Sequence, residues 1–194
     1  MSSTRNIYIK PLTLYEAKAV YIGNAHRDFP SNELKPFSMI ERLWNRGCYN
    51  GYGFYEADIL RAYAFLMADG STNMLLVDYF AVCENARGKG YGTEALALLK
   101  ETCMERNGII FEVEDEDSAK SEEEILIRRR RIAFYEKCGV VMTNVRSHVF
   151  GVDYRLMVMP LADRDAGEGI GEKLTSLYKL MLPKWEFDSV FRLR

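Results

Sequence analysis

The sequence has little that would direct the protein to a membrane or let it hold a metal. No apolar run in its 194 residues approaches the ~18 that a membrane-spanning helix needs. The first ten residues, MSSTRNIYIK, lack the apolar segment of a signal peptide. The two histidines, His26 and His148, are too isolated to form a metal site. We therefore expect a cytoplasmic protein with no membrane association and no bound metal.

Cysteine and net charge are also low. The four cysteines, Cys48, Cys83, Cys103 and Cys138, stand far apart without a C-x-x-C pair, which argues against a zinc site and a dense disulfide framework. A net charge of −2 gives no general attraction to nucleic acid, so no nucleic-acid partner is expected. No internal repeat or long linker divides the chain, and its 48% hydrophobic content can bury the core of one globular domain.

The most informative stretch begins with Met74–Val82, an apolar and aromatic run of strand length that only Asp78 interrupts. A turn follows, and then residues 91–104 carry apolar side chains at helical spacing. A glycine-rich basic loop, residues 87–92, joins the two patterns. The sequence therefore predicts a buried central strand, a loop and the N-terminus of a helix.

This loop has the composition of an anion site. The first N–H groups of a helix lack intrahelical partners and carry the positive end of its dipole. Gly88, Gly90 and Gly92 let the backbone approach an oxygen closely, while Arg87 and Lys89 add positive charge. We expect a phosphate group there; the alternative is a plain strand-to-helix turn with two solvated cations.

The other patterns predict an α+β domain with a local β-α-β crossover. Thr13 is expected to cap the first helix, and Gly139 to end the helix before the closing strand pair. The apolar residues expected to pack that last helix are Ile125, Ile127, Ile132, Phe134 and Tyr135. The expected strands are residues 6–10, 51–57, 60–67, 108–113, 140–144, 153–159 and 185–193, and the expected helices are residues 13–25, a segment starting near 36, 125–140 and 171–181.

The spacing of the glycines distinguishes this loop from two known types of phosphate-binding loop. The third glycine comes one residue early for the dinucleotide fingerprint, and a G-K-[ST] ending is missing. Arg87, Gly90 and Gly92 instead spell R-x-x-G-x-G after a strand that ends in residues 80–82, and Phe134 to Gly139 spell F-Y-x-x-x-G. With these two motifs, about 40 residues apart and in this order, the chain resembles the GNAT superfamily of N-acyltransferases.

The resemblance implies the GNAT fold, with a mixed central sheet of about six to seven strands flanked by about four helices. Residues 1–162 would form the N-acetyltransferase domain. Residues 163–194 fall outside the common core and would be a C-terminal extension that packs on the domain or forms the interface of a homodimer.

The resemblance also implies acetyl-CoA as cosubstrate and direct transfer of the acetyl group to a primary amine in a ternary complex. The pantetheine would lie along the central strand like an added strand. The pyrophosphate would lie on the loop. The implied cofactor-binding residues are Phe80, Ala81 and Val82 on the strand, and Arg87, Gly88, Lys89, Gly90, Tyr91, Gly92 and Thr93 on the loop.

Tyr135, in the F-Y-x-x-x-G motif, would be the general acid toward the CoA sulfur. The alternative is a core aromatic whose hydroxyl finds a partner. Where many family members have an asparagine seven positions before this tyrosine and an alanine four positions before it, this chain has Arg128 and Arg131. The usual asparagine contact to CoA is therefore not expected here.

Three carboxylates could act as the general base. Asp78 lies inside an apolar strand, and Glu112 and Glu114 share one face of the next strand. Asp78 and Glu112 rank equally, because burial would raise the pKa of either one. The structural alternative is that salt bridges to the arginines of residues 128–131 satisfy all three.

Residues 112–124 contain eight acidic side chains, and four consecutive arginines follow at residues 128–131. The acidic segment could attract a cationic amine while the arginines meet the 3′-phosphate of CoA. Alternatively, the segment is a solvated loop before a charged helix. The functional alternative to an enzyme is a non-catalytic acyl-CoA-binding regulatory module with the same fold.

Overall fold

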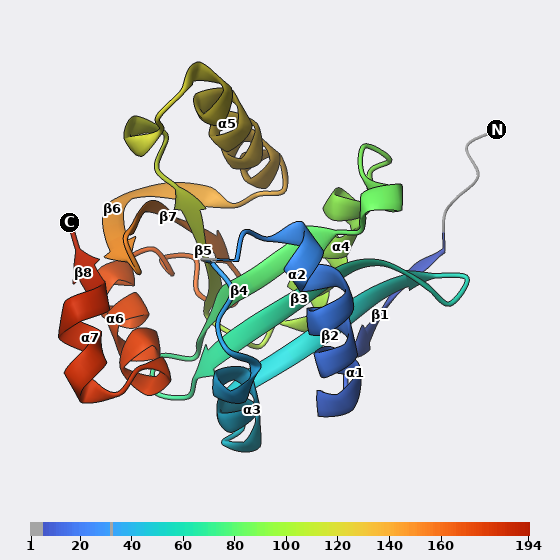
Figure 1. Ribbon diagram of the computed structural model, residues 1–194, viewed down its shortest axis with the longest axis horizontal. Coiled ribbons are helices and arrows are strands. Elements are labelled where there is room, and N and C mark those ends of the chain that lie inside the picture. The colour runs from blue at the N-terminus through green and yellow to red at the C-terminus, as the bar shows by residue number, and fades with distance from the viewer. Residues whose placement is uncertain (1–5, 32) are drawn as a thin grey trace. The chain divides into compact units, whose positions relative to one another are not determined.

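The computed structural model describes residues 6–31 and 33–194 (Figure 1). The expectation that the first ten residues hold no signal peptide therefore falls partly outside the described residues. The chain forms two compact units, of which the first contains Met1–Ala68 and Val77–Cys103 and the second contains Asp69–Leu76 and Met104–Arg194. In the part of the chain that the structure describes, no helix is long and apolar enough to cross a membrane.

The strands of the first unit form a meander. They lie in the order β1 (Ile7–Pro11), β2 (Tyr49–Glu56), β3 (Ile59–Asp69) and β4 (Met74–Val82), although Asp69 of β3 and residues 74–76 of β4 are assigned to the second unit. The β1–β2 and β2–β3 pairs are antiparallel. Ala57 and Asp58 turn the β2–β3 hairpin with positive φ values of 48° and 62°, the backbone that a two-residue hairpin turn requires.

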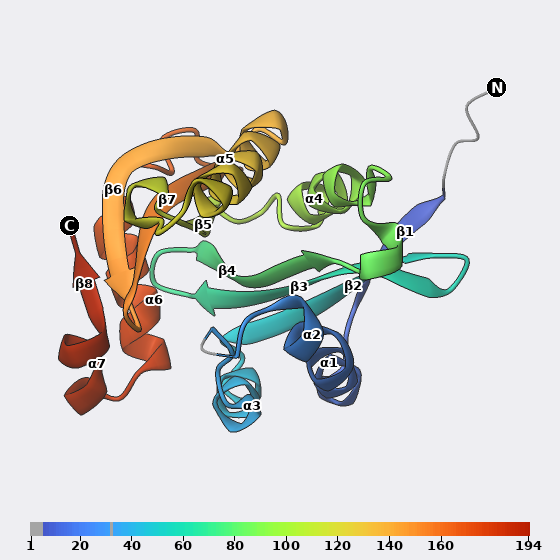
Figure 2. The same ribbon diagram turned by 45° about the horizontal axis from the view of Figure 1, so that its top comes forward.

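Helices cover both faces of β1–β4. The first runs from α1 (Leu14–Val20) through the π-helical η1 (Tyr21–Ala25) to α2 (His26–Asp28), and α3 (Phe37–Asn45) follows. These helices lie on one face of the strands, and α4 (Tyr91–Thr102) lies on the other (Figure 2). Thr13 caps α1 as expected, since its hydroxyl accepts the N–H of Glu16 at 3.3 Å and the Glu16 carboxylate accepts the N–H of Thr13 at 2.8 Å.

The core of the first unit is rich in aromatic side chains. Tyr21, Phe54, Tyr63 and Phe65 are each at most 1% exposed. The ring of Phe65 lies 6.3 Å from that of Tyr21 and 6.0 Å from that of Tyr63. Burial of each such side chain stabilises the fold by about 1.5–3 kcal/mol, so this cluster fixes the helices against the strands that carry the site residues.

In the second unit the strands lie in the order β5 (Gly108–Glu114), β7 (Val152–Pro160), β6 (Val141–Val149) and β8 (Phe191–Leu193), all antiparallel to their neighbours. The helices are α5 (Glu122–Lys137), α6 (Ile170–Met181) and α7 (Lys184–Val190). Tyr135 of α5 packs on Phe111 of β5, and Tyr178 of α6 bonds Glu112. Because successive strand residues point to opposite faces, α5 and α6 cover opposite faces of β5.

The predicted α+β class is confirmed. Residues 6–31 and 33–194 contain eight strands, where six to seven were expected, and seven α-helical segments, where about four were expected. The expected strand at residues 185–193 is wrong. After Pro183 these residues form α7, and only Phe191–Leu193 pair with β6. Proline is well suited to the start of a helix, and the ring of Phe187 packs on Phe191 at 5.1 Å, which helical spacing allows.

The residues expected to pack α5 are only partly correct. Ile132 and Tyr135 are buried, but Ile127 is 48% exposed. Residues 163–194 pack into the second unit through α6, where Leu174 and Leu177 are fully buried. Their role as a separate extension, and the boundary at residue 162, remain predictions.

Candidate active site

The glycine loop of the first unit leads directly into the N-terminus of α4. Gly88 has φ +71° and Gly90, the N-cap of α4, has φ +88°. Both angles lie in the left-handed region, where a side chain is strained. Gly92 lies inside the first turn of α4 and is buried. The backbone thus takes the form that a glycine-rich phosphate loop needs at a helix N-terminus.

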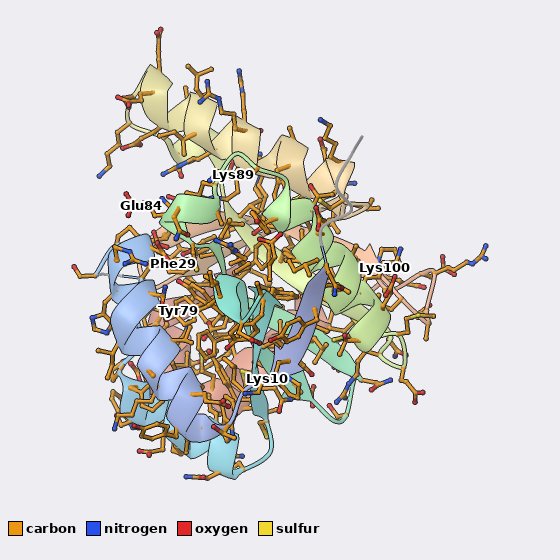
Figure 3. All side chains as sticks on the ribbon, turned by 90° about the vertical axis from the view of Figure 1, so that its right-hand side faces the viewer. Lys10, Phe29, Tyr79, Glu84, Lys89 and Lys100 are labelled. Carbon is orange, nitrogen blue, oxygen red and sulfur yellow. The ribbon has the colours of Figure 1, made fainter. Side chains whose placement is uncertain are left out.

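The two cations of this loop are held by neighbouring oxygens. Arg87 donates from Nε to the Val82 carbonyl at 3.1 Å and pairs with Asp28 at 2.7 Å. Lys89, labelled in Figure 3, donates to the Asn85 carbonyl at 2.8 Å. The Arg87 side chain is still 53% exposed, and a guanidinium has five N–H donors. It can therefore brace the loop and still offer donors to an anion.

Asp28, at the end of α2, was not predicted as a site residue. Its side chain is 1% exposed, and it accepts the Tyr63 hydroxyl at 3.0 Å as well as the Arg87 guanidinium. Burial, followed by the Asp28 charge, raises the pKa of Tyr63 well above its usual range. Asp28 thus links α2 to the loop, a contact across 59 residues that no local pattern signals.

Tyr91 and Thr93 fix the start of α4. The Tyr91 hydroxyl donates to Glu56 of β2 at 2.5 Å, and Glu56 also pairs with Arg61 of β3 at 3.0 Å. The Thr93 N–H donates to the Gly90 carbonyl at 3.1 Å. Tyr91 is 6% exposed, so its side chain anchors the helix and leaves anion contact to the backbone.

The end of β4 carries Phe80, Ala81 and Val82, which are all half-buried. The Val82 carbonyl accepts the Arg87 side chain, and the next residue, Cys83, donates its N–H to the Arg61 carbonyl at 2.8 Å. These two hydrogen bonds fix the end of β4 directly before the glycine loop.

Asp78, the one charge in the β4 run, is the most polar feature of the first unit's core. Its side chain is 3% exposed. Lys35 pairs with Oδ1 at 2.5 Å, and the Tyr49 hydroxyl donates to Oδ2 at 2.5 Å. Burial and then the charge of Asp78 raise the pKa of Tyr49 well above its usual range, so this phenol stays a donor.

Aromatic side chains enclose the Lys35 segment. The Tyr79 hydroxyl accepts the Lys35 N–H at 2.9 Å and donates to the Glu33 carbonyl at 3.1 Å. The Tyr21 hydroxyl donates to the Lys35 carbonyl at 2.5 Å. Tyr79 packs edge-on against Phe29, and the two are labelled together in Figure 3. Lys35 and Tyr49 were not predicted as site residues, because neither a lysine in a loop nor a tyrosine on a strand signals a contact with a distant carboxylate.

In the second unit, Tyr135 lies on the buried side of α5. It is 8% exposed, and its ring is 4.9 Å from Phe111 and 5.3 Å from Phe134. Burial raises the pKa of Tyr135 to about 12, although the nearby Arg131 charge opposes the rise. The phenol is therefore protonated at neutral pH, as a proton donor must be.

Glu112 and Glu114 of β5 have different surroundings. Glu112 accepts the Ser147 hydroxyl at 2.8 Å and the Tyr178 hydroxyl at 2.6 Å. Glu114 pairs with Arg128 at 3.1 Å and with Arg131 at 2.8 Å. Arginine pairing, the structural alternative for the three carboxylates, is thus present at Glu114, while Glu112 joins β6 and α6 to β5 through hydroxyl groups.

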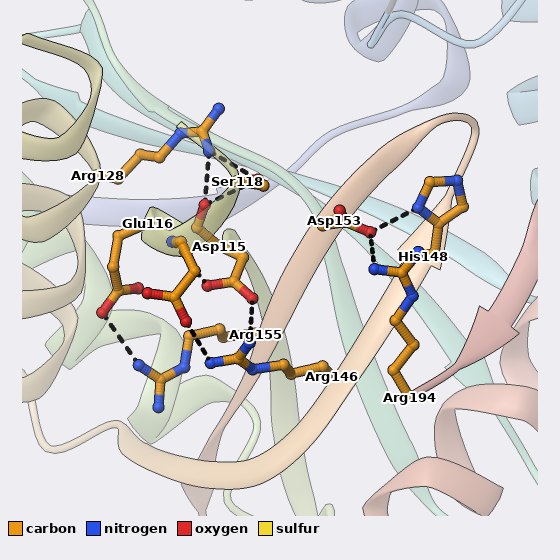
Figure 4. Close-up of polar contacts among 10 residues, drawn as sticks. Asp115, Glu116, Ser118, Arg128, Arg146, His148, Asp153, Arg155 and Arg194 are labelled. Atoms are coloured by element: carbon orange, nitrogen blue, oxygen red, sulfur yellow. Dashed lines mark hydrogen bonds and ion pairs between the residues drawn. The ribbon is translucent and has the colours of Figure 1, made fainter. Parts of the chain in front are cut away.

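The acidic segment after β5 is paired with arginines from three elements (Figure 4). Arg146 of β6 bonds Asp115 at 3.1 Å, and Arg155 of β7 bonds Glu116 at 3.1 Å. Arg128 of α5 donates to the Asp115 carbonyl at 2.5 Å. Much of the negative charge is therefore neutralised within the second unit, which favours the structural interpretation of this segment.

A second polar group lies at the end of the β6–β7 hairpin (Figure 4). Asp153 is 2.6 Å from Nδ1 of His148 and 3.0 Å from Arg194. The His148 bond and the Arg194 charge lower the pKa of Asp153. Within the described residues, no group of three or more His, Cys, Asp or Glu side chains could hold a metal ion.

The candidate residues divide between the two units. The loop, the end of β4 and Asp78 belong to the first unit, and Tyr135 and Glu112 belong to the second. An arginine and a glycine-rich loop at a helix start, directly after a strand, are typical of proteins that bind phosphorylated ligands.

Comparison of the sequence with models of known protein families identifies the family of this chain. Residues 19–140 match the model of the acetyltransferase (GNAT) family. This match spans more than half of the chain, and it contains β4, the loop, α4 and the F-Y-x-x-x-G helix. The chain belongs to the GNAT acetyltransferase family and is thus an N-acetyltransferase of the transferase class.

Solved structures agree on the GNAT fold. A protein from Bacteroides thetaiotaomicron assigned to the GNAT family is 21% identical, with a TM-score of 0.66, and the match covers 88% of this chain and 97% of that one. The ribosomal-protein-S18-alanine N-acetyltransferase of Escherichia coli is 16% identical, with a TM-score of 0.57 and coverages of 81% and 95%.

A Bacillus subtilis acetyltransferase solved in complex with CoA is 14% identical, with a TM-score of 0.54, and the match covers 81% of this chain and 99% of that one. No curated protein sequence matches the chain. At these identities the solved structures support the fold, and the acceptor has to be inferred from this chain's own residues.

Proposed function

We propose that the protein transfers the acetyl group of acetyl-CoA directly to a primary amine of a small molecule or a protein. One observation carries the proposal: Gly88 and Gly90 hold the left-handed backbone of a phosphate loop at the N-terminus of α4, beside Arg87. The CoA complex of the Bacillus subtilis acetyltransferase, which shares the fold, supports CoA as the carrier.

Acetyl-CoA is proposed to bind along the end of β4 and over the loop. Backbone groups of residues 80–82 hold the pantetheine in the manner of an added strand. The N–H groups of the loop and of the first turn of α4, with Arg87 and Lys89, hold the pyrophosphate. The pantetheine and pyrophosphate sites are thus consecutive along the chain, and a hydrogen bond from Arg87 to the Val82 carbonyl joins them.

The proposed chemistry needs a base for the ammonium ion and an acid for the leaving thiolate. A carboxylate takes a proton from the acceptor, and the neutral amine attacks the thioester carbonyl, so that a C–N bond forms and the C–S bond breaks. Tyr135 gives its proton to the sulfur. Its raised pKa, about 12, keeps that proton available at neutral pH.

Asp78 is the proposed base, and Glu112 is the alternative. Both are carboxylates held by hydroxyl or ammonium donors. Asp78 belongs to the same unit and the same strand as residues 80–82, where the thioester end of the pantetheine is proposed to lie.

Acetyl-CoA binding can be tested by calorimetry on the wild-type chain and on an Arg87→Glu, Gly90→Val double variant. We expect the double variant to lose binding, because it reverses a charge and strains a φ of +88°. The matched control is Arg46→Glu, Gly47→Val, an adjacent pair on an exposed turn with φ +71° at the glycine. Equal binding by both double variants would refute the loop assignment.

Turnover is tested by release of free CoA thiol from acetyl-CoA across polyamines, aminoglycosides, amino acids and lysine or N-terminal peptides. Release with one class of amine would support the proposed function. Tight acetyl-CoA binding with no release by any amine would favour the non-catalytic regulatory module.

Two further proposals concern the setting of the enzyme. We place it in the cytoplasm, without a nucleic-acid or membrane partner. Residues 163–194 are proposed to contribute to a homodimer interface or to pack on the domain alone, and size-exclusion chromatography of the full chain with and without added acetyl-CoA would separate these cases.

A further inference from the structure

The ammonium group of Lys35 lies where few lysine side chains are found. The side chain is 14% exposed, and its Nζ is 2.5 Å from the buried Asp78 carboxylate. The same Nζ lies 5.4 Å from the ring centre of Tyr79, in the range of a cation–π contact. Tyr49 completes the group by donating to the second oxygen of Asp78.

We call the two partners of the ammonium group, Asp78 and the ring of Tyr79, together with Tyr49, which bonds Asp78, the ammonium cage. All three lie on strands, with Tyr49 on β2 and the other two on β4. They are mostly buried, since Tyr49 is 1% exposed and Tyr79 is 2% exposed. Rigid strands position a binding site more precisely than loops do. Only the cation comes from a segment between helices.

The place of the cage on β4 connects it to the proposed reaction. Asp78 is two residues before Phe80 on β4. Phe80 begins the stretch that is proposed to hold the pantetheine. An ammonium ion bound at Asp78 would therefore lie beside the strand along which the acyl carrier extends.

Resting on the function proposed above, we propose that the ammonium cage is the subsite for the acceptor amine and that Lys35 fills it until the acceptor replaces it. Lys35 then indicates the substrate class. It is an unbranched aliphatic chain that ends in a primary ammonium group. The acceptor is a linear primary alkylammonium ion, such as a diamine or a lysine side chain.

The energetics permit this exchange. Removing the cation from a buried ion pair leaves an uncompensated charge and is strongly unfavourable. Replacing it by another ammonium ion keeps the Asp78 pair, the cation–π contact and the Tyr49 bond. The geometry also selects among amines. A quaternary ion has no N–H to donate to Asp78, and a branched stem is broader than the Lys35 chain.

The proton balance is complete with groups already named. The bound acceptor gives one proton to Asp78 and attacks the thioester as a neutral amine. The nitrogen loses a second proton as the amide forms, the sulfur gains the proton of Tyr135, and solvent receives the net proton released. The products are the N-acetylated amine and CoA thiol.

The first test is chemical rescue of a Lys35→Ala variant with n-propylammonium chloride. This ion supplies the atoms that the substitution removes. We expect the Tm of Lys35→Ala to lie below that of wild type and to rise by about 4 °C at saturating n-propylammonium. The rise should be smaller in wild type, because there the ion has to displace Lys35 from the cage.

Three controls define the rescue. The matched variant is Lys18→Ala, which removes an ammonium group 5.5 Å from the Phe37 ring. Among the described residues this ammonium group has no salt bridge to a carboxylate, so the variant should show no rescue. Neutral n-propanol and tetramethylammonium should also fail. A rise of the same size with n-propanol, or in Lys18→Ala, would overturn the cage as an ammonium site.

The second test links the cage to turnover and does not depend on the stability of Lys35→Ala. Tyr49→Phe keeps the Lys35–Asp78 pair and removes one hydrogen bond to the cage. We expect the KM of n-butylamine to rise severalfold in Tyr49→Phe while the KM of acetyl-CoA stays unchanged. Equal KM values for n-butylamine in both proteins would overturn the acceptor role of the cage.

Failure of this inference and failure of the proposed function give different results. Rescue of Lys35→Ala together with no CoA thiol release from any amine would refute the enzyme. Thiol release with a branched or aromatic amine, at a rate that Tyr49→Phe does not alter, would support the enzyme and refute the cage as its acceptor subsite.

Discussion

Asp78 of the first unit and Glu112 of the second are strand carboxylates that are both satisfied by side chains from distant elements. They differ in the kind of partner. Asp78 is held by one ammonium group and one phenol. Glu112 is held by two neutral hydroxyls, those of Ser147 and Tyr178. A cation that pairs with a carboxylate can be exchanged for a substrate cation.

The partners of Glu112 cannot be exchanged in this way, because they belong to the fold. Ser147 is fully buried on β6, and Tyr178 is 3% exposed on α6. Both would have to move with their elements to free the carboxylate. The comparison predicts a catalytic part for Asp78 and a structural part for Glu112, and the following variants test that difference.

The largest effect is expected for Asp78→Asn. The amide keeps the size of the side chain but cannot accept a proton from the acceptor. The turnover number should fall by about 100-fold to 10,000-fold, the usual range for loss of a general base. Steady-state release of CoA thiol measures it. A variant with wild-type turnover would show that Asp78 is not the base.

Tyr135→Phe should lower turnover by about 100-fold, because the thiolate then leaves without a proton donor. Its affinity for acetyl-CoA, measured by calorimetry, should stay nearly unchanged. Because the pKa of Tyr135 is about 12, its loss of a proton should not limit wild-type turnover between pH 7 and about 10. A full-rate variant would remove Tyr135 from the mechanism.

The raised pKa of Tyr135 also predicts that the folded protein loses stability at alkaline pH. The folded pKa of Tyr135 lies above its usual value of 10.0, so the unfolded chain loses this proton first as the pH rises. The stabilising contribution is complete below that usual pKa and is lost as the pH rises toward about 12. Urea unfolding should therefore lose more stability over this pH range in wild type than in Tyr135→Phe.

For Glu112→Gln we expect a loss of stability with little loss of turnover. The amide exchanges a charged acceptor for a neutral one opposite Ser147 and Tyr178. The free energy of unfolding should fall by about 1–3 kcal/mol, as for other hydrogen bonds to charged groups. Urea denaturation gives this value. If turnover collapses while stability holds, the comparison between Asp78 and Glu112 is reversed.

The smallest effect is expected for Tyr178→Phe. It removes one donor to Glu112 and leaves the buried ring of α6 in place, beside Phe191 at 4.7 Å. The free energy of unfolding should fall by about 1 kcal/mol. In the double variant Glu112→Gln, Tyr178→Phe, the two losses should not add, because one weakens and the other removes the same hydrogen bond. Full additivity would contradict the pairing.

The sequence was sufficient wherever local chemistry decides the structure. The β4 run, the glycine loop and the start of α4 were predicted in place, because strand hydrophobicity, glycine spacing and helix periodicity act over a few residues. Asp78 was recognised as an anomaly in an apolar strand. Its partners were not, since Lys35 and Tyr49 are 43 and 29 residues away in the chain.

The same limit explains the errors in the second unit. Trp185 and its neighbours were predicted to form a strand, but the residues before Phe191 form a helix that starts after Pro183. Ile127 of α5 was expected to be packed and is 48% exposed, because α5 interleaves apolar and charged residues on all sides. Tertiary partners decide such segments, and no local pattern names them.

The most direct measurement is mass spectrometry of a linear primary diamine after incubation with acetyl-CoA and the wild-type protein. We expect a diamine heavier by one acetyl group, an equal amount of free CoA thiol, and neither product without the protein. An unchanged diamine, under conditions in which calorimetry shows acetyl-CoA to be bound, would contradict acetyl transfer to a linear primary amine.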